Sequence, residues 1–272
     1  MTQQSKENGT GSTSEPLAGR GAVITGGGRG IGEAIARRLA ADGAGVVISA
    51  RSKDEIEALA ESLRRDGHRA TAVACDVTDP EQIQGLLEQA NRDLGQVDIL
   101  VNNAGVASSA PLKAVTLEEW NRLFSVNATG TFLGTQAFLP EMVARGWGRV
   151  VNVASIAGKM GAPYISAYAA SKHAVIGFTR SVALEVAAKG VTVNAVCPGY
   201  VRTEMSETTV RNIVAKTGLD AEQARRNLET MSPQGRIFEA DEVAHLVSSL
   251  CDPRARGVNG QAVVLDGGAL QS

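Results

Sequence analysis

Short apolar runs alternate with longer amphipathic stretches along almost the whole chain. Each run is nearly continuous in apolar residues, which is typical of strands that are covered on both faces in a parallel sheet. The predicted strands are residues 22–25, 45–49, 70–75, 97–101, 149–153, 191–196 and 262–265. The predicted helices lie between them, at residues 33–42, 53–65, 80–94, 117–144, 165–188 and 240–250.

This alternation predicts an α/β fold, because successive strands of a parallel sheet are joined by crossover segments, usually helices. We expect a Rossmann-type doubly wound parallel sheet of about seven strands with helices on both faces. Residues 1–16 are polar and rich in Ser, Thr, Gly and Gln, and they are expected to form a disordered tail. The remaining residues, 17–272, are enough for one domain with a substantial core.

One segment of this domain, residues 205–237, departs from the regular alternation. Its pattern predicts two short helices, Glu207–Lys216 and Asp220–Met231. Irregular segments of this length in a compact domain often cover a binding site. We therefore expect a mobile lid over the substrate.

The composition limits the kinds of partner that the chain can have. It carries 27 basic and 29 acidic residues, a formal net charge of -2, so it has no general attraction for nucleic acid or for an anionic membrane. Cys75, Cys197 and Cys251 lack the paired spacing of a disulfide framework or a zinc site, and we expect no metal. The first residues lack the apolar stretch of a signal peptide, and no segment approaches membrane-spanning length, which favours a cytoplasmic protein.

A glycine-rich turn follows the first predicted strand and opens the first predicted helix. The run is Thr25-Gly-Gly-Gly-Arg-Gly-Ile-Gly32, and its spacing differs from the commoner Gly-x-Gly-x-x-Gly fingerprint. Glycines at these positions let the backbone turn sharply and aim the amides of the helix at a pyrophosphate. The turn predicts a dinucleotide site, although glycine turns also occur without ligands.

Tyr168 and Lys172 are four residues apart and therefore share one face of a predicted helix. A phenol ionises near pH ~10, so a nearby positive charge is needed if Tyr168 is to exchange protons at neutral pH. Lys172 could supply that charge. The alternative is an ordinary amphipathic helix whose lysine extends into solvent.

Further polar or turn-forming residues follow the predicted strands directly. They are Asp76, the run Asn102-Asn-Ala-Gly105, Ser155 and the pair Pro198-Gly199. Turn chemistry explains each of them alone. Because a doubly wound sheet binds its ligand outside the carboxyl ends of its strands, their common placement predicts a site at that edge.

Together these residues resemble the short-chain dehydrogenase/reductase family over residues 17–272. The motifs that carry the resemblance are Thr25-Gly-x-x-x-Gly-Ile-Gly32, Asn102-Asn-Ala-Gly105, Asn127, Ser155 and Tyr168-x-x-x-Lys172. The resemblance implies that Tyr168 gives a proton to a ketone oxygen during hydride transfer from a nicotinamide, and removes it in the oxidative direction. Lys172 would favour the phenolate and hold the nicotinamide ribose, while Ser155 would hold the carbonyl oxygen.

In the family, the asparagine that corresponds to Asn127 helps to fix a water linked to the lysine. The other family residues here are implied to bind the dinucleotide. They are Thr25, Gly26, Gly28, Arg29, Gly30, Ile31, Gly32, Arg51, Ser52, Asp76, Val77, Asn103, Ala104, Gly105, Pro198, Gly199, Val201 and Thr203, together with Tyr168 and Lys172.

Charge near the second predicted strand bears on which nicotinamide cofactor is used. Relatives that bind NAD usually end this strand with an acidic residue, whereas Ala50 and Arg51 stand here. Arg29 lies inside the glycine turn, so two cations are expected near the extra phosphate of NADP. The sequence therefore favours NADP over NAD, with solvated arginines as the plain alternative.

The motifs favour an NADPH-dependent ketoreductase that reduces a 3-oxoacyl thioester or a similar small-molecule ketone. Similar relatives include 3-oxoacyl thioester reductases, polyketide ketoreductases and 3-hydroxybutyrate dehydrogenases. An NAD-linked 3-hydroxyacid or secondary-alcohol dehydrogenase is one alternative, and an NADP-sensing or scaffold protein is the other. The resemblance also implies a homotetramer, paired through the predicted helices 117–144 and 165–188.

Overall fold

Seven parallel strands form a single sheet at the centre of the protein in a computed structural model that describes residues 15–270. The strands are β1 Gly21–Thr25, β2 Gly45–Ala50, β3 Ala70–Ala74, β4 Ile99–Asn102, β5 Gly148–Val153, β6 Val191–Pro198 and β7 Ala262–Leu265. Their order is β3-β2-β1-β4-β5-β6-β7, so the direction of winding reverses between β1 and β4. This confirms the predicted doubly wound sheet and places its ligand crevice beside β1 and β4.

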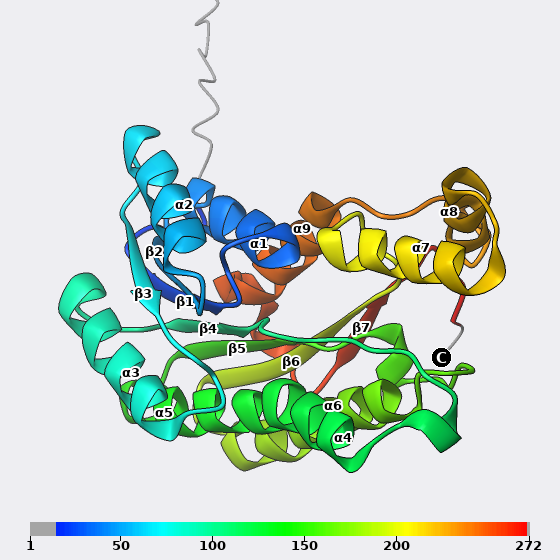
Figure 1. The fold of residues 1–272 in the computed structure, drawn as a ribbon. Helices are drawn as coiled ribbons and strands as arrows, with labels where there is room; N and C mark the ends of the chain where they lie inside the picture. The colour runs from blue at the N-terminus through cyan, green and yellow to red at the C-terminus, as the bar shows by residue number, and fades with distance from the viewer. Residues whose placement is uncertain (1–14, 271–272) are drawn as a thin grey trace, which may run out of the picture.

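Helices cover both faces of the sheet (Figure 1). They are α1 Gly30–Ala41, α2 Lys53–Arg65, α3 Pro80–Leu94, α4 Leu117–Phe124, α5 Gly130–Arg145, α6 Ser166–Val186, α7 Glu204–Thr217, α8 Ala221–Glu229 and α9 Ala240–Cys251. Alternate residues of one strand enter different cores: in β1, Ile24 packs with α1, α2 and α9, while Val23 packs with α3, α5 and α6. The strands are therefore buried on both faces, as their continuous apolar runs predict.

The long helix predicted for residues 117–144 is not continuous. A five-residue π-helix, η2 Ser125–Thr129, separates α4 from α5 and contains Asn127. Periodicity missed this interruption because one wide turn changes the apolar spacing very little. Such wide turns commonly occur at functional sites.

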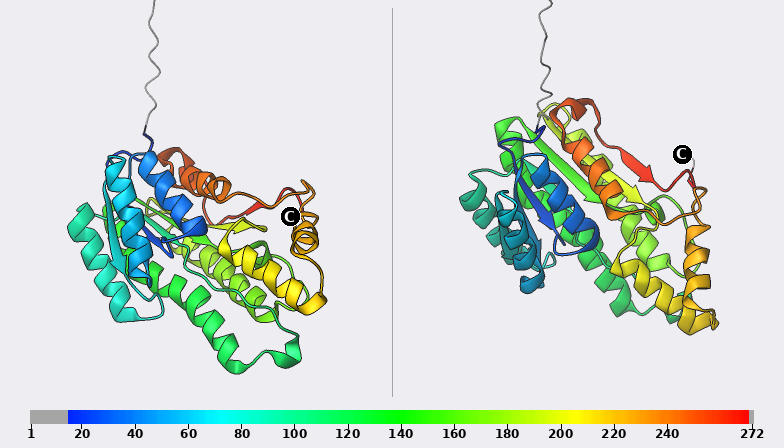
Figure 2. Two further views of the ribbon diagram at one scale, coloured as in Figure 1. Left: turned by 45° about the horizontal axis from the view of Figure 1, so that its top comes forward. Right: turned by 90° about the horizontal axis from the view of Figure 1, so that it is seen from above.

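The irregular segment after β6 contains two helices, α7 and α8, as its pattern predicts. The side chain of Thr203 accepts a hydrogen bond at the start of α7, and the side chain of Asp220 does so at the start of α8. Figure 2 shows both helices beyond the end of the sheet towards which β7 points. They are therefore placed at the carboxyl edge of the sheet, where a lid would lie.

Most of the predicted disordered tail, residues 1–14 of 1–16, lies outside the described residues. Glu15 and Pro16 are described, and the carbonyl of Glu15 accepts a hydrogen bond from the amide of Ala18 at 3.1 Å. Within residues 15–270, no helix combines the length and the apolar character needed to cross a membrane.

Candidate active site

The glycine turn connects β1 to α1 with a backbone that only glycine adopts readily. Gly26 has a φ of 62° and Gly30 a φ of 55°, and a side chain on Gly32 would place its Cβ 2.2 Å from the carbonyl oxygen of Gly26. The side chain of Asn103 holds this turn by donating to the carbonyls of Thr25 at 3.0 Å and of Gly26 at 2.9 Å. The end of β4 therefore fixes the loop that follows β1.

The first turn of α1 fits the phosphates of a dinucleotide. Arg29 is the N-cap residue but its side chain makes no capping hydrogen bond. The hydrogen bonds within residues 15–270 include no acceptor for the amides of Gly30, Ile31 or Gly32. Free amides at the positive end of a helix are donors for phosphate oxygens, which is the chemistry that the glycine turn predicts.

Three predicted catalytic side chains come together beside the ends of β5 and β6. Ser155 follows β5 and accepts a hydrogen bond from the amide of Ala157 at 3.1 Å, which begins the short 3₁₀-helix η3 Ile156–Gly158. Ser155 lies close enough to Tyr168, in the first turn of α6, for its side chain to favour the ionised form of the phenol. The Lys172 ammonium lies 5.9 Å from the centre of the Tyr168 ring and donates to the carbonyl of Val153 at 2.9 Å.

Burial controls the acidity of both groups in this cluster. It raises the pKa of the Tyr168 hydroxyl, and the side chain of Ser155 only partly opposes this. It also lowers the pKa of the Lys172 ammonium to about 8. Desolvation therefore outweighs the favourable contribution and the pKa of Tyr168 is raised overall, while the effect of Lys172 on the phenolate stays a prediction. Tyr168 keeps its proton at neutral pH and is suited to act as an acid.

Asn127 links the loop after β4 to α6. Its side-chain amide donates to the carbonyl of Val106 and to the hydroxyl of Ser171, each at 2.9 Å, and its oxygen accepts from the amide of Val106 at 2.8 Å. Ser171 in turn donates to the carbonyl of Tyr168 at 2.7 Å. Asn127 therefore supports the turn that carries Tyr168, a role that sequence reasoning did not assign to it.

Ser171 itself was missed by sequence reasoning. The residue is fully buried beside Lys172, on a helix whose small residues face the core. The available signal was a serine next to the predicted catalytic lysine on a helix expected to face the core, because buried hydroxyls need hydrogen-bond partners.

The two arginines predicted near the cofactor have different surroundings. Arg29 donates to Glu204 at 2.6 Å and lies 3.7 Å from Glu55, so two carboxylates already offset its charge. Arg51 follows β2, is exposed, and has no ion-pair partner within the described part of the chain. Both glutamates come from other elements, which is why the local sequence around Arg29 did not indicate them.

The remaining predicted residues are gathered at the same edge of the sheet. Asp76 follows β3 and accepts hydrogen bonds from the amide of Thr78 at 2.9 Å and from its hydroxyl at 2.8 Å. Pro198 ends β6, and the nearby Val201 forms a bridge with Phe238 just before α7. Other residues predicted there stand at the ends of β2, β3, β4 and β6: Ser52, Val77, Ala104, Gly105, Gly199 and Thr203.

Comparison with known proteins agrees with this arrangement. The family described as short chain dehydrogenase matches residues 20–213. D-beta-hydroxybutyrate dehydrogenase of Cupriavidus necator is 37% identical over 258 residues, covering 93% of this chain and 98% of the relative. Oxidoreductase UcpA of Escherichia coli is 39% identical over 254 residues, with 93% and 95% of the two chains covered.

A solved structure of a variant of actinorhodin polyketide ketoreductase with NADPH superposes with a TM-score of 0.89. It is 37% identical, and the match covers 92% of this chain and 97% of that one. The chain therefore belongs to the short-chain dehydrogenase/reductase family and is an NAD(P)-dependent oxidoreductase acting on CH–OH groups.

Proposed function

We propose that the protein is an NADPH-dependent ketoreductase that reduces a 3-oxoacyl thioester or a similar ketone to a secondary alcohol. The proximity of Ser155 to Tyr168, with Lys172 one helical turn further on, carries this proposal. It places a proton donor and a second hydroxyl where one carbonyl oxygen can meet both groups.

The residues divide the work of moving the proton. The bound nicotinamide supplies the hydride. Tyr168 donates the proton of its hydroxyl to the ketone oxygen, which its raised pKa allows at neutral pH. The hydroxyl of Ser155 accepts from the amide of Ala157, which leaves its own hydrogen for the developing alkoxide. Lys172, with a pKa of about 8, is largely protonated at neutral pH and can hold the nicotinamide ribose.

The preference for NADPH rests on Arg51. This arginine stands after β2, where an acidic residue would repel the 2′-phosphate of NADP, and no carboxylate in the described structure pairs with it. The structural relative that was solved with NADPH is consistent with this choice. Replacing Arg51→Glu should lower kcat/KM with NADPH by about a hundredfold while leaving the value with NADH within about threefold, as expected for loss of a charge-assisted pair. Equal losses with both cofactors would contradict the assignment.

The substrate class is proposed from the relatives. Polyketide ketoreductase and D-beta-hydroxybutyrate dehydrogenase are named among the similar proteins. Both names describe chemistry at a carbon near a carbonyl or carboxyl group. Steady-state assays with a panel of 3-oxoacyl thioesters, free 3-oxo acids and simple ketones test the proposal. Absence of turnover with every 3-oxo compound in the panel would overturn the substrate class.

A second candidate function is an NAD-linked 3-hydroxyacid dehydrogenase. The observation that favours it is the pairing of Arg29 with Glu204 and Glu55, which leaves one fewer free cation for the 2′-phosphate of NADP. Oxidation of 3-hydroxybutyrate with NAD at a higher kcat/KM than reduction of 3-oxoacyl thioesters with NADPH would select this candidate. The family membership disfavours a scaffold or sensor without turnover.

We also propose that the enzyme is a cytoplasmic homotetramer that pairs through α5 and α6. The exposed side chains of Phe132 on α5 and Leu184 on α6 support an interface there. Light scattering on the purified protein tests the assembly, and a monomer at micromolar concentration would contradict it.

A further inference from the structure

Arg29 joins the glycine turn to the start of the lid. Its guanidinium donates to the carboxylate of Glu204, the first residue of α7, at 2.6 Å. The packing beside this ion pair is also close, because a side chain on Gly30 would place its Cβ 3.2 Å from Cγ2 of Thr203. The start of α7 therefore lies directly against the start of α1 (Figure 1).

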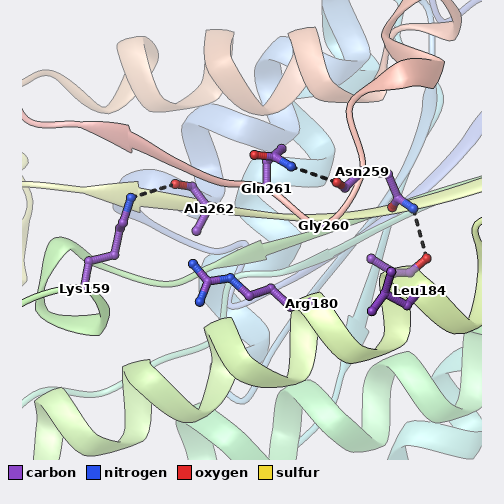
Figure 3. A pocket seen from close by; sticks show the side chains of 8 residues that line it. Lys159, Arg180, Leu184, Asn259, Gly260, Gln261 and Ala262 are labelled. Atoms are coloured by element: carbon purple, nitrogen blue, oxygen red, sulfur yellow. Dashed lines mark hydrogen bonds between the residues drawn. The ribbon is translucent and has the colours of Figure 1, made fainter. Parts of the chain in front are cut away.

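A second carboxylate approaches Arg29 from α2. The Glu55 carboxylate lies 3.7 Å from the guanidinium, and a Cβ on Gly28 would lie 3.2 Å from one of its oxygens. Not every cation of the protein is balanced in this way. Figure 3 shows Arg180 extending from α6 beside β7, and none of the residues that line the hollow around it is acidic. The charge of Arg29, by contrast, is offset by two carboxylates from outside its own loop.

The start of α2 offers donors to an anionic group of the cofactor. Ser52 is the N-cap residue of this helix, but its side chain makes no capping hydrogen bond. Within residues 15–270, the hydrogen bonds include no acceptor for the amides of Lys53, Asp54 or Glu55. In a doubly wound sheet the end of the second strand meets the 2′-position of the adenine ribose, so these amides face the place of a 2′-phosphate. Arg29, which lies 3.7 Å from Glu55, reaches the same place.

We propose that Glu204 competes with the 2′-phosphate of NADP for Arg29, so that binding of NADP, unlike binding of NAD, frees the start of α7 from the glycine turn. This inference rests on the proposed NADP site. A phosphate ester carries about two negative charges and can accept parallel N–H bonds from a guanidinium. The carboxylate of Glu204 carries one charge on a side chain that is 62% exposed, so Arg29 leaves it at little cost. Glu204 therefore affects the choice of cofactor from within the lid.

The other contacts of α7 do not involve the glycine turn. Near the end of the helix, Lys216 donates to the carbonyl of Ser109 at 3.2 Å. In its first half, Glu207 pairs with Arg225 of α8 at 2.8 Å. Both contacts remain when Arg29 turns to a phosphate. The effect of NADP on the lid is therefore confined to the first turns of α7.

Isothermal titration calorimetry of the full-length protein at low salt, where exposed charges are least screened, measures the competition. NADP and NAD are titrated separately into the wild type, Glu204→Gln and Glu222→Gln. Glu222 is the matched control, because it is an exposed glutamate of the same lid, pairs with Arg226, and changes the net charge equally when replaced. Glu204→Gln should bind NADP about threefold more tightly, as expected for loss of an exposed competing pair. Its affinity for NAD should stay within about 1.5-fold, which also shows that the variant is folded.

The Arg29→Gln background shows whether Glu204 acts through Arg29. There the further change Glu204→Gln should leave the affinity for NADP unaltered, because no guanidinium remains for the two anions to share. A threefold gain in this background as well would overturn the proposal and assign Glu204 to direct repulsion of the phosphate. No gain in the wild-type background, an equal gain for NAD, or an equal gain in Glu222→Gln would overturn it too.

Amide hydrogen exchange with each cofactor at saturation measures the release of the lid. The first two turns of α7 should exchange about threefold faster with NADP than with NAD in the wild type, and equally with both in Glu204→Gln. Equal protection of these turns by both cofactors in the wild type would contradict the release. Neither measurement uses a ketone, so both are independent of the turnover assays that test the ketoreductase proposal. The titrations compare each cofactor only with itself, so they are valid whichever cofactor the enzyme prefers.

Discussion

The region behind the catalytic residues and the lid are stabilised in different ways. Behind the catalytic residues, buried polar side chains are joined across the sheet: Asn102 donates to Asn152 at 2.9 Å, and Asn152 donates to Thr179 of α6 at 2.9 Å. In the lid, α7 and α8 are joined by a half-exposed ion pair between Arg225 and Glu207. Buried hydrogen bonds are costly to break, whereas exposed ion pairs contribute little.

The apolar cluster of the lid is also smaller than the cores around the sheet. The sheet and its flanking helices share two large cores, while the lid has a small cluster around Val210, Leu228 and Ile237. The lid also touches the loop after β4 through Lys216, which donates to the carbonyl of Ser109 at 3.2 Å. The proposal that the segment containing α7 and α8 is a substrate lid predicts such a difference, because a lid must open more easily than the region that holds the catalytic residues.

The largest expected effect is on kcat, and it follows from removing the transferable proton of Tyr168. Tyr168→Phe should lower kcat by about a thousandfold, because a general acid contributes about that much. The free energy of unfolding should change little, since the ring keeps its packing. Tyr164→Phe is the matched control, because Tyr164 is exposed and lies on the loop before α6. Retention of more than about a tenth of kcat by Tyr168→Phe would remove Tyr168 from the proton step.

The rigid region should also show a pH-dependent stability that depends on Lys172. Its pKa is lowered from 10.5 to about 8 in the folded protein, so below pH 8 the folded state bears the full cost of burying the charge. This cost disappears as pH rises to about 10.5, where the unfolded chain also loses the proton. The stability of the wild type relative to Lys172→Met should therefore rise by about 3 kcal/mol across this interval.

Urea unfolding of the cofactor-free protein at several pH values measures this rise. Lys189→Met, which changes an exposed lysine, should keep the pH dependence of the wild type. A constant difference between wild type and Lys172→Met from pH 8 to 10.5 would contradict the lowered pKa.

The next effect is a loss of stability, and it is expected when the link between α6 and the loop after β4 is broken. It should be smaller than the pH-dependent change that depends on Lys172. Asn127→Ala leaves the amide and carbonyl of Val106 and the hydroxyl of Ser171 without their partner. It should lower the free energy of unfolding by about 2 kcal/mol and reduce kcat as well. Asn121→Ala, an exposed change on the preceding helix, should alter both quantities very little. Equal stability of the two variants would mean that the link does not stabilise the catalytic region.

The smallest effect on stability is expected in the lid. Arg225→Gln breaks a pair whose side chains are 36% and 38% exposed, so the free energy of unfolding should fall by less than about 1 kcal/mol. If the lid covers the substrate, KM for the ketone should rise severalfold while kcat stays within about twofold. Arg226→Gln is the control, because the partner of Arg226 among residues 15–270 is Glu222 of its own helix. A loss of stability as large as that of Asn127→Ala would show that the lid belongs to the rigid region.

Local patterns were sufficient to predict the sheet and the placement of the site residues. Each strand is an apolar run in the sequence, and the order of strands and helices leaves few ways to arrange them. Ser155, Tyr168 and Lys172 were predicted to meet, and the structure brings them together. The glycine turn was also predicted, and its positive φ angles at Gly26 and Gly30 show why glycine is needed there.

Individual ion pairs and hydrogen bonds between distant segments were not predicted. Arg29 is paired with Glu204, which is 175 residues away in the sequence, and this pairing changes the expected charge near the cofactor. The side chain of Asn127 in the π-helix is hydrogen-bonded to partners in the loop after β4 and in α6. The pKa of Tyr168 is set by burial, which no sequence spacing reveals.

The sequence by itself determined the α/β architecture, the edge of the sheet where the candidate site lies and the residue types that are proposed to perform the chemistry. These properties follow from apolar periodicity and turn chemistry, which act between neighbours in the chain. The tertiary structure alone decided which charges are paired and which protons are held. Those properties depend on distance and solvent exposure in space, because electrostatic energy is set by separation and local dielectric rather than by position along the chain.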